Sequence, residues 1–145
     1  LVEEARGIAA VTGKDARVAV ALAGVIPYFL GRECIDVLGK NDRRVAKLPM
    51  RRGIQRLDRS DDFYPGHLKW DFAYSLGELQ PDIVHRDLWR GRSEAERFLG
   101  RSYDAVRVGR YDFFALRGSP NIDWLRVRRG GSEATRGDAQ PSSGK

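Results

Sequence analysis

The sequence contains very little cysteine and histidine: Cys34 is the single cysteine, and His67 and His85 are the two histidines. One cysteine cannot form a disulfide within the chain, and the cysteine–histidine spacing of a zinc site is absent. Because Cys34 lies inside an apolar segment, we interpret it as a buried structural thiol. We therefore expect no disulfide scaffold, no metal and no cofactor.

Long hydrophobic runs are also absent. The longest, residues 18–30, is interrupted by Gly24 and Pro27, and a membrane-spanning helix needs roughly 20 apolar residues. A Walker loop, a GxGxxG motif and a serine–histidine–acid arrangement are missing as well. The familiar nucleotide-binding and hydrolase motifs therefore suggest no function for this chain.

The chain has charge instead. Its 145 residues include 26 lysine and arginine residues against 20 acidic ones, for a net charge of +6, and 41% of the residues are hydrophobic. These proportions are typical of one soluble domain with a highly charged surface. The positive excess indicates either an anionic neighbour, such as a lipid headgroup surface or a phosphorylated ligand, or simply an arginine-rich solvated surface. Acidic residues interrupt the basic ones throughout, so we do not expect nucleic acid as a partner.

The first half of the chain predicts a parallel core. Residues 17–23 are small and β-branched without polar alternation, which is typical of a strand covered on both faces, and residues 33–38 predict a second strand parallel or nearly parallel to it. A helical pattern over residues 1–11 precedes them. Two short helices are predicted at residues 26–30 and 43–48, and Asn41 or Asp42 can cap the second.

The second half predicts mixed structure after a long surface loop at residues 50–64. Apolar residues at steps of three and four predict a helix over 67–79, and another short helix is expected at 88–100. The remaining apolar or alternating segments predict strands at 83–85, 103–108, 111–117 and 124–128.

These elements together predict the fold class. We expect one α/β domain over residues 1–129, a small three-layer sandwich whose short parallel core sheet is extended by a C-terminal antiparallel hairpin. Residues 130–145 are rich in glycine, serine and charge and predict a disordered tail.

Polar and glycine residues gather just after the predicted strands, where open α/β sheets place their ligand sites. We expect the following residues to lie near one another: Gly24, Tyr28, Asp36, Gly39, Asn41, Asp42, Gly66, His67 and Lys69. The glycines are assigned to the turns. Asp36 interrupts an apolar strand and needs a hydrogen-bonding partner there, so we interpret it as a buried anchor of the turns at Gly24 and Gly39, with a substrate-binding or acid/base role as the alternative.

The other polar candidates also have two interpretations each. Asp42 is first a helix N-cap. His67 could be a general base or a phosphate ligand, or a structural hydrogen-bonding residue, and His85 we treat as structural. Lys69 offers a positive charge suited to a phosphate, or is simply solvated.

Several of these segments, taken in order, carry a resemblance to a known family. They are the turn GVIPY at 24–28, the strand end DVLG at 36–39, the pair Asn41–Asp42, the element GHLK at 66–69 and the segment QPDIV at 80–84. This succession resembles the C-terminal soluble domain of bacterial GT-C-type membrane glycosyltransferases that use polyprenyl-phosphate sugar donors, similar to the mannosyl- and arabinosyltransferase-like proteins of actinobacterial cell envelopes. Lys40 departs from the pattern, which commonly has an apolar residue there.

The resemblance implies an accessory role. In that family the catalytic aspartates lie in a transmembrane part, so this domain would have no catalytic residue and would sit on the extracytoplasmic face of the cell membrane. It would help bind a glycan acceptor or a polyprenyl-phosphate sugar through Tyr28, Asn41, Asp42, His67 and Lys69. Its partners would be the upstream transmembrane region of the same protein and an anionic membrane surface. The chain starts at Leu1 without a leader, and we expect it to be the C-terminal part of a longer protein.

Two other classes of function stay open. The first is a stand-alone binding or interaction module without catalysis, in which the glycine turns are purely architectural. The second is a small soluble enzyme that uses Asp42 and His67 as an acid/base pair, which requires both side chains to reach a common substrate.

Overall fold

The computed structural model describes residues 1–51, 68–88 and 91–129. Its helices are α1 (Val2–Val11), α2 (Val25–Leu30), α3 (Arg43–Ala46), the π-helix η3 (Ala73–Glu78) and α4 (Arg92–Ser102). Its strands are β1 (Arg17–Val20), β2 (Glu33–Asp36), β3 (Ile83–His85), β4 (Tyr103–Val108), β5 (Tyr111–Leu116) and β6 (Arg128–Arg129). The expected disordered tail at 130–145 lies outside the described residues, as does nearly all of the expected loop at 50–64.

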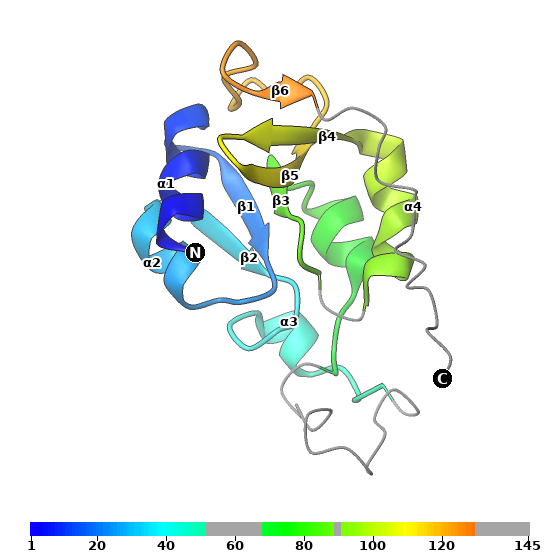
Figure 1. The fold of residues 1–145 in the computed structure, drawn as a ribbon. Helices are drawn as coiled ribbons and strands as arrows, with labels where there is room; N and C mark the ends of the chain where they lie inside the picture. Colours follow the sequence, from blue (N-terminus) through cyan, green and yellow to red (C-terminus); the bar gives the residue numbers. More distant parts are fainter. Residues whose placement is uncertain (52–67, 89–90, 130–145) are drawn as a thin grey trace, which may run out of the picture.

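The described strands form one mixed sheet in the order β2-β1-β3-β5-β4-β6 (Figure 1). β1 pairs in parallel with β2 on one side and with β3 on the other, so that Val18 lies opposite both Cys34 and Ile83. β3, β5, β4 and β6 then pair antiparallel. The predicted α/β class, with a parallel core extended by an antiparallel hairpin, is confirmed.

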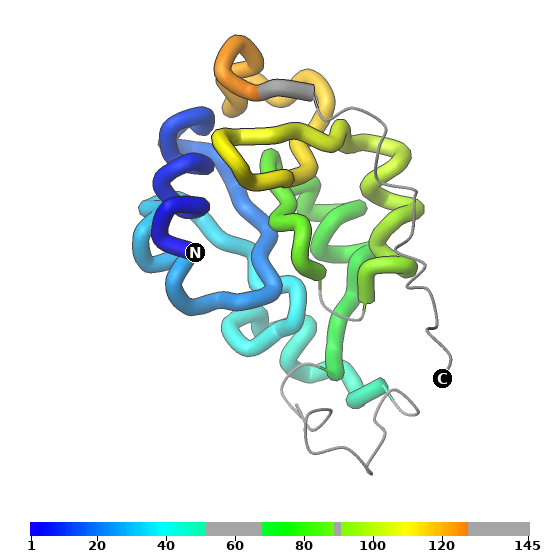
Figure 2. The backbone as a smooth tube through the Cα atoms, viewed as in Figure 1, coloured from blue at the N-terminus to red at the C-terminus, as the bar shows by residue number. Residues whose placement is uncertain are grey.

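Helices cover both faces of the sheet. Figures 1 and 2 show α1 and α2 side by side on one face, and η3 and α4 on the other. The buried side chains of β1 explain its unbroken apolar sequence: Val18 and Val20 pack in the core under α1 and α2, whereas Ala19 packs in the core under η3 and α4. This alternation gives the three layers that the sequence predicted.

The helix predicted at residues 67–79 is wrong in extent and type. Leu68 and Trp70 are buried in an irregular segment, and the described helix is the six-residue η3. Asp71 accounts for the late start, because its carboxylate accepts the backbone N–H of Tyr74 at 3.1 Å and so caps the turn that follows. The edge strand predicted at 124–128 is also wrong in position: Trp124 donates its indole N–H to the Ser119 carbonyl at 3.0 Å, and β6 begins only at Arg128.

The buried carboxylate of Asp82 lies just before β3, at the edge of the sheet where β1 begins. Asp82 accepts the backbone N–H of Arg17, at the start of β1, at 2.8 Å. It also accepts the hydroxyl of Ser119 at 2.5 Å and the amide of Asn121 at 3.3 Å. Asp82 therefore ties the segment after β5 to the start of β1.

The thiol of Cys34 is expected to react slowly. Burial, and secondarily the charge of Glu33, raises the pKa of Cys34 to about 11. At pH 8 the thiolate fraction, and hence the alkylation rate, should be roughly 100-fold below that of an ordinary exposed cysteine. Iodoacetamide labelling followed by mass spectrometry across pH measures this, with the urea-unfolded chain as the control. A rate that levels off near pH 9 would contradict the assignment.

Candidate functional site

The chain leaves β2 through a turn organised by Asp36. This side chain is only 4% exposed. Its Oδ1 accepts the backbone N–H groups of Leu38 at 3.0 Å and Gly39 at 3.1 Å, and its Oδ2 accepts that of Asn41 at 2.7 Å. Backbone N–H groups are thus the partners that the buried carboxylate requires. These bonds tie the Asp36 carboxylate to the backbone of the Gly39 turn. Gly24 begins α2 differently, because its carbonyl accepts the N–H of Tyr28 at 3.2 Å.

Gly39 brings the next helix close to this turn. Its φ is +75°, in the left-handed region that favours glycine. A Cβ at this position would lie 2.5 Å from Cγ1 of Val45, which is fully buried in α3. The absence of a side chain at Gly39 therefore lets Val45 and α3 pack directly against the end of β2.

Asp42 starts α3 as the sequence predicted. Its Oδ1 accepts the backbone N–H groups of Arg44 at 2.9 Å and Val45 at 2.8 Å, an N-cap in the usual geometry. Its Oδ2 faces the hydroxyl of Tyr74 at 3.4 Å. Partial burial and the neighbouring Asp42 carboxylate both raise the pKa of Tyr74, so its phenol stays protonated at neutral pH and can donate.

Arg44 connects α3 to η3. Its guanidinium lies over the ring of Tyr74, 4.1 Å from the centroid. It also pairs with Glu78 at 2.8 Å and lies 3.8 Å from Asp71. Such exposed pairs are individually weak, each contributing about 0.2–1 kcal/mol. Because three groups hold it, Arg44 serves chiefly to fix Tyr74 beside Asp42.

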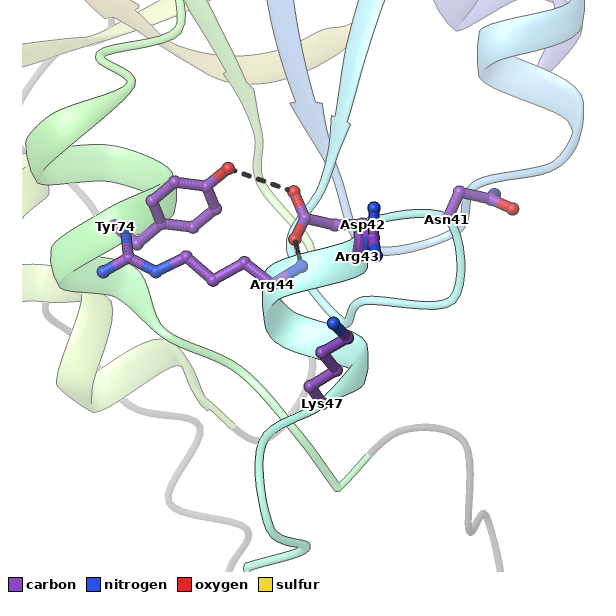
Figure 3. Close-up of a pocket in the computed structure, with 6 residues that line it drawn as sticks. All are labelled: Asn41, Asp42, Arg43, Arg44, Lys47 and Tyr74. Carbon is purple, nitrogen blue, oxygen red and sulfur yellow. Dashed lines mark hydrogen bonds between the residues drawn. The ribbon is translucent and has the colours of Figure 1, made fainter.

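These residues line an open pocket with a volume of about 460 Å³, which we call the α3 pocket: Asn41, Asp42, Arg43, Arg44, Lys47 and Tyr74. Figure 3 shows Asp42 between Tyr74 on one side and Asn41 on the other. The lining carries three cationic side chains and one carboxylate. Within the described part of the chain, neither Arg43 nor Lys47 has an ion-pair or hydrogen-bonding partner for its side chain. Arg43 and Lys47 are therefore two uncommitted cations of the α3 pocket: both are exposed to solvent, and neither side chain is engaged by a described residue.

The structure brings some predicted site residues together and separates others. Asn41 and Asp42 line the α3 pocket. Lys69 lies next to α3, but its Nζ donates to the carbonyl of Ala46 at 2.6 Å, so it holds the end of the helix. Tyr28 does not line the pocket: it is 82% exposed on the outer side of α2, because Ile26 and Leu30 fill the buried side of that helix. Gly66 and His67 lie outside the described residues.

Sequence reasoning missed Arg43, Arg44, Lys47 and Tyr74. The spacing of Arg43 and Lys47, four residues apart after a polar pair, places both on one helical side and could have identified them. Tyr74 gives no such signal, because only the packing of η3 beside α3 brings it to Asp42.

Across residues 1–51, 68–88 and 91–129, no group of three or more histidine, cysteine, aspartate or glutamate side chains is arranged to hold a metal ion. No helix within these ranges is both long and apolar enough to cross a bilayer.

Comparison with known proteins gives one family. Neither the curated proteins nor the solved structures include a significant match to the chain. A family model described as "Domain of unknown function (DUF8728)" matches residues 2–127, which include every helix of the described fold and all its strands except β6. The chain belongs to the DUF8728 family.

Proposed function

We propose that this domain is the extracytoplasmic accessory domain of a membrane glycosyltransferase, and that it helps bind a lipid-phosphate sugar donor or an acceptor glycan. The observation that carries this proposal is the pair of uncommitted cations, Arg43 and Lys47, in the α3 pocket. The ordered resemblance of its motifs to such domains supports the same assignment.

The polar groups of the α3 pocket suit a sugar phosphate. Arginine offers planar paired donors and lysine a compact positive charge, and both are common phosphate ligands. Asn41 is exposed and its side-chain amide can donate to or accept from sugar hydroxyls. Oδ2 of Asp42 accepts only the long hydrogen bond from the Tyr74 hydroxyl, at 3.4 Å. It can therefore accept a further hydrogen bond from a sugar hydroxyl.

The same geometry favours binding over catalysis at this pocket. Oδ1 of Asp42 is occupied by two backbone N–H groups at the start of α3. Two N–H donors hold the Asp42 carboxylate in one orientation, which suits a recognition role more than proton transfer. The reacting groups would then belong to the upstream transmembrane region. The proposal therefore predicts apolar helices in the reading frame upstream of Leu1.

Removing the two cations is expected to weaken phosphate binding. The variant Arg43→Gln/Lys47→Gln should bind mannose-1-phosphate at least about tenfold more weakly than the wild-type chain, because each charge-assisted hydrogen bond contributes about 1.5–3 kcal/mol. Phosphorus NMR titration measures the affinity. Mannose without phosphate should bind poorly to both proteins.

A matched control separates the pocket from the total charge. The variant Arg6→Gln/Lys14→Gln also removes one arginine and one lysine charge, but from exposed positions in α1 and before β1. This control should bind mannose-1-phosphate as the wild type does. Equal losses in both double variants would indicate a general charge effect and would refute a phosphate site at α3.

A further inference from the structure

Exposed apolar side chains gather along α2 and in the turn before it. Val25, Tyr28 and Phe29 share its outer side and are 38%, 82% and 47% exposed, and Leu22 in the preceding turn is 38% exposed. We call these four residues the α2 patch. The rings of Tyr28 and Phe29 meet edge to face, with centroids 5.0 Å apart.

The composition of α2 makes this exposure unusual. Its six residues, VIPYFL, include no charged side chain, and Ile26 and Leu30 already fill the buried side. A surface helix normally turns polar residues outward, whereas a helix that is apolar on all sides is normally covered on all sides. The outer side of α2 therefore has the composition of a covered surface.

The α2 patch begins at the edge of the sheet where the α3 pocket lies. β1 and β2 are parallel neighbours in register, with Val20 opposite Asp36. The chain consequently leaves both strands at one edge, first into the turn that starts α2 and then into the turn that starts α3. Figure 1 shows the start of α2 and the whole of α3 at this end of the molecule.

We propose that the α2 patch docks on an anionic lipid bilayer, with the α3 pocket at the level of the headgroups. Aromatic and aliphatic side chains enter the interfacial region of a bilayer, and lysine and arginine beside them are attracted to anionic headgroups. The α2 patch contains no acidic residue, and Arg43 and Lys47 supply the positive charge at the same edge. This inference rests on the proposed function and deepens it: the phosphate bound by the pocket is presented by a lipid surface.

Flotation of the full 145-residue chain with vesicles tests the docking. Vesicles of phosphatidylcholine with one-third phosphatidylglycerol should bind the wild-type chain more strongly than pure phosphatidylcholine vesicles, and added salt should weaken the binding. The variant Tyr28→Ser/Phe29→Ser should reduce the vesicle-bound fraction about tenfold at matched lipid concentration. Leu125→Ser is the control, because Leu125 is 99% exposed in the segment after β5, and its binding should be unchanged.

The outcomes distinguish the two proposals. The docking proposal is overturned if Tyr28→Ser/Phe29→Ser binds vesicles like the wild type while its circular dichroism is unchanged. It is also overturned if sedimentation shows a wild-type dimer that this variant loses, since a second copy would then cover the patch. The variant should retain wild-type affinity for mannose-1-phosphate. Vesicle binding through the α2 patch without any affinity for mannose-1-phosphate would support the docking and refute the phosphate-binding function.

Discussion

Replacing Asp36 with alanine is expected to lower the free energy of unfolding by about 3–5 kcal/mol, because it removes the side-chain acceptor of the Leu38 and Asn41 backbone N–H groups and leaves Gly39 only its bond to the Asp36 carbonyl. The carboxylate accepts from Leu38, Gly39 and Asn41 at 2.7–3.1 Å and is nearly fully buried. Urea unfolding followed by circular dichroism measures the loss.

A conservative replacement at the same position separates hydrogen bonding from packing. Asp36→Asn keeps one accepting oxygen in nearly the same volume, and should cost about 1–2 kcal/mol. If Asp36→Ala and Asp36→Asn are both within about 0.5 kcal/mol of the wild type, the range typical of neutral surface substitutions, Asp36 does not anchor the Gly39 turn.

Replacing Gly39 with alanine should also be costly, by about 2–5 kcal/mol. The left-handed backbone adds about 1–2 kcal/mol for a residue with a Cβ, and overpacking adds about 1–3 kcal/mol. The added Cβ would lie 2.5 Å from Val45 Cγ1 and 2.8 Å from the backbone nitrogen of Ala46. Because α3 must shift to relieve this contact, the affinity of the α3 pocket for mannose-1-phosphate should fall as well.

Gly109 supplies the matched control for Gly39. It has a similar left-handed backbone, with φ +61°, but no atom within 4 Å of an added Cβ. Gly109→Ala should therefore lose only the conformational part, about 1–2 kcal/mol, with no change in phosphate affinity. Thermal unfolding of the two variants side by side checks the difference. Equal destabilisation would mean that the close approach of α3 to Gly39 contributes little.

Asp36 and Gly39, whose replacement is expected to be most costly, lie in the same turn between β2 and α3. Asp36 ends β2 by supplying acceptors to amides that a longer strand would pair with a neighbour. Gly39 then allows α3 to pack close to this turn. The helix and the two residues that cap it supply four of the side chains that line the pocket: Asp42, Arg43, Arg44 and Lys47. The position of the α3 pocket therefore depends on the buried end of β2.

The sequence predicted most of the fold because apolar patterning reports burial. β3 and β4 have the boundaries predicted from residues 83–85 and 103–108, since their side chains meet a core on the expected faces. β1 and β2 were predicted two or three residues too long. The apolar run continues past Val20 and Asp36, because Ala21, Val37 and Leu38 stay buried although the backbone has already left the sheet.

The candidate site was less predictable from the sequence. Asn41 and Asp42 were identified because polar residues after a buried strand mark the edge where ligands bind. Tyr74 was missed because it reaches Asp42 through tertiary packing alone. Tyr28 was expected near Asp42 but does not line the α3 pocket, because it lies on the exposed side of α2. Capping of α3 by Asp42 could be predicted from neighbouring residues in the sequence, whereas the contact of Asp42 with Tyr74 could not.

Nitrogen-edited NMR of the labelled chain during titration with mannose-1-phosphate tests the central claim most directly. If the domain holds a phosphate with Arg43 and Lys47, the largest shift changes should fall on the amides of residues 41–47 and of Tyr74, and should disappear in Arg43→Gln/Lys47→Gln. Shift changes that centre on other elements, or that persist unchanged in this variant, would contradict a phosphate-binding site at α3.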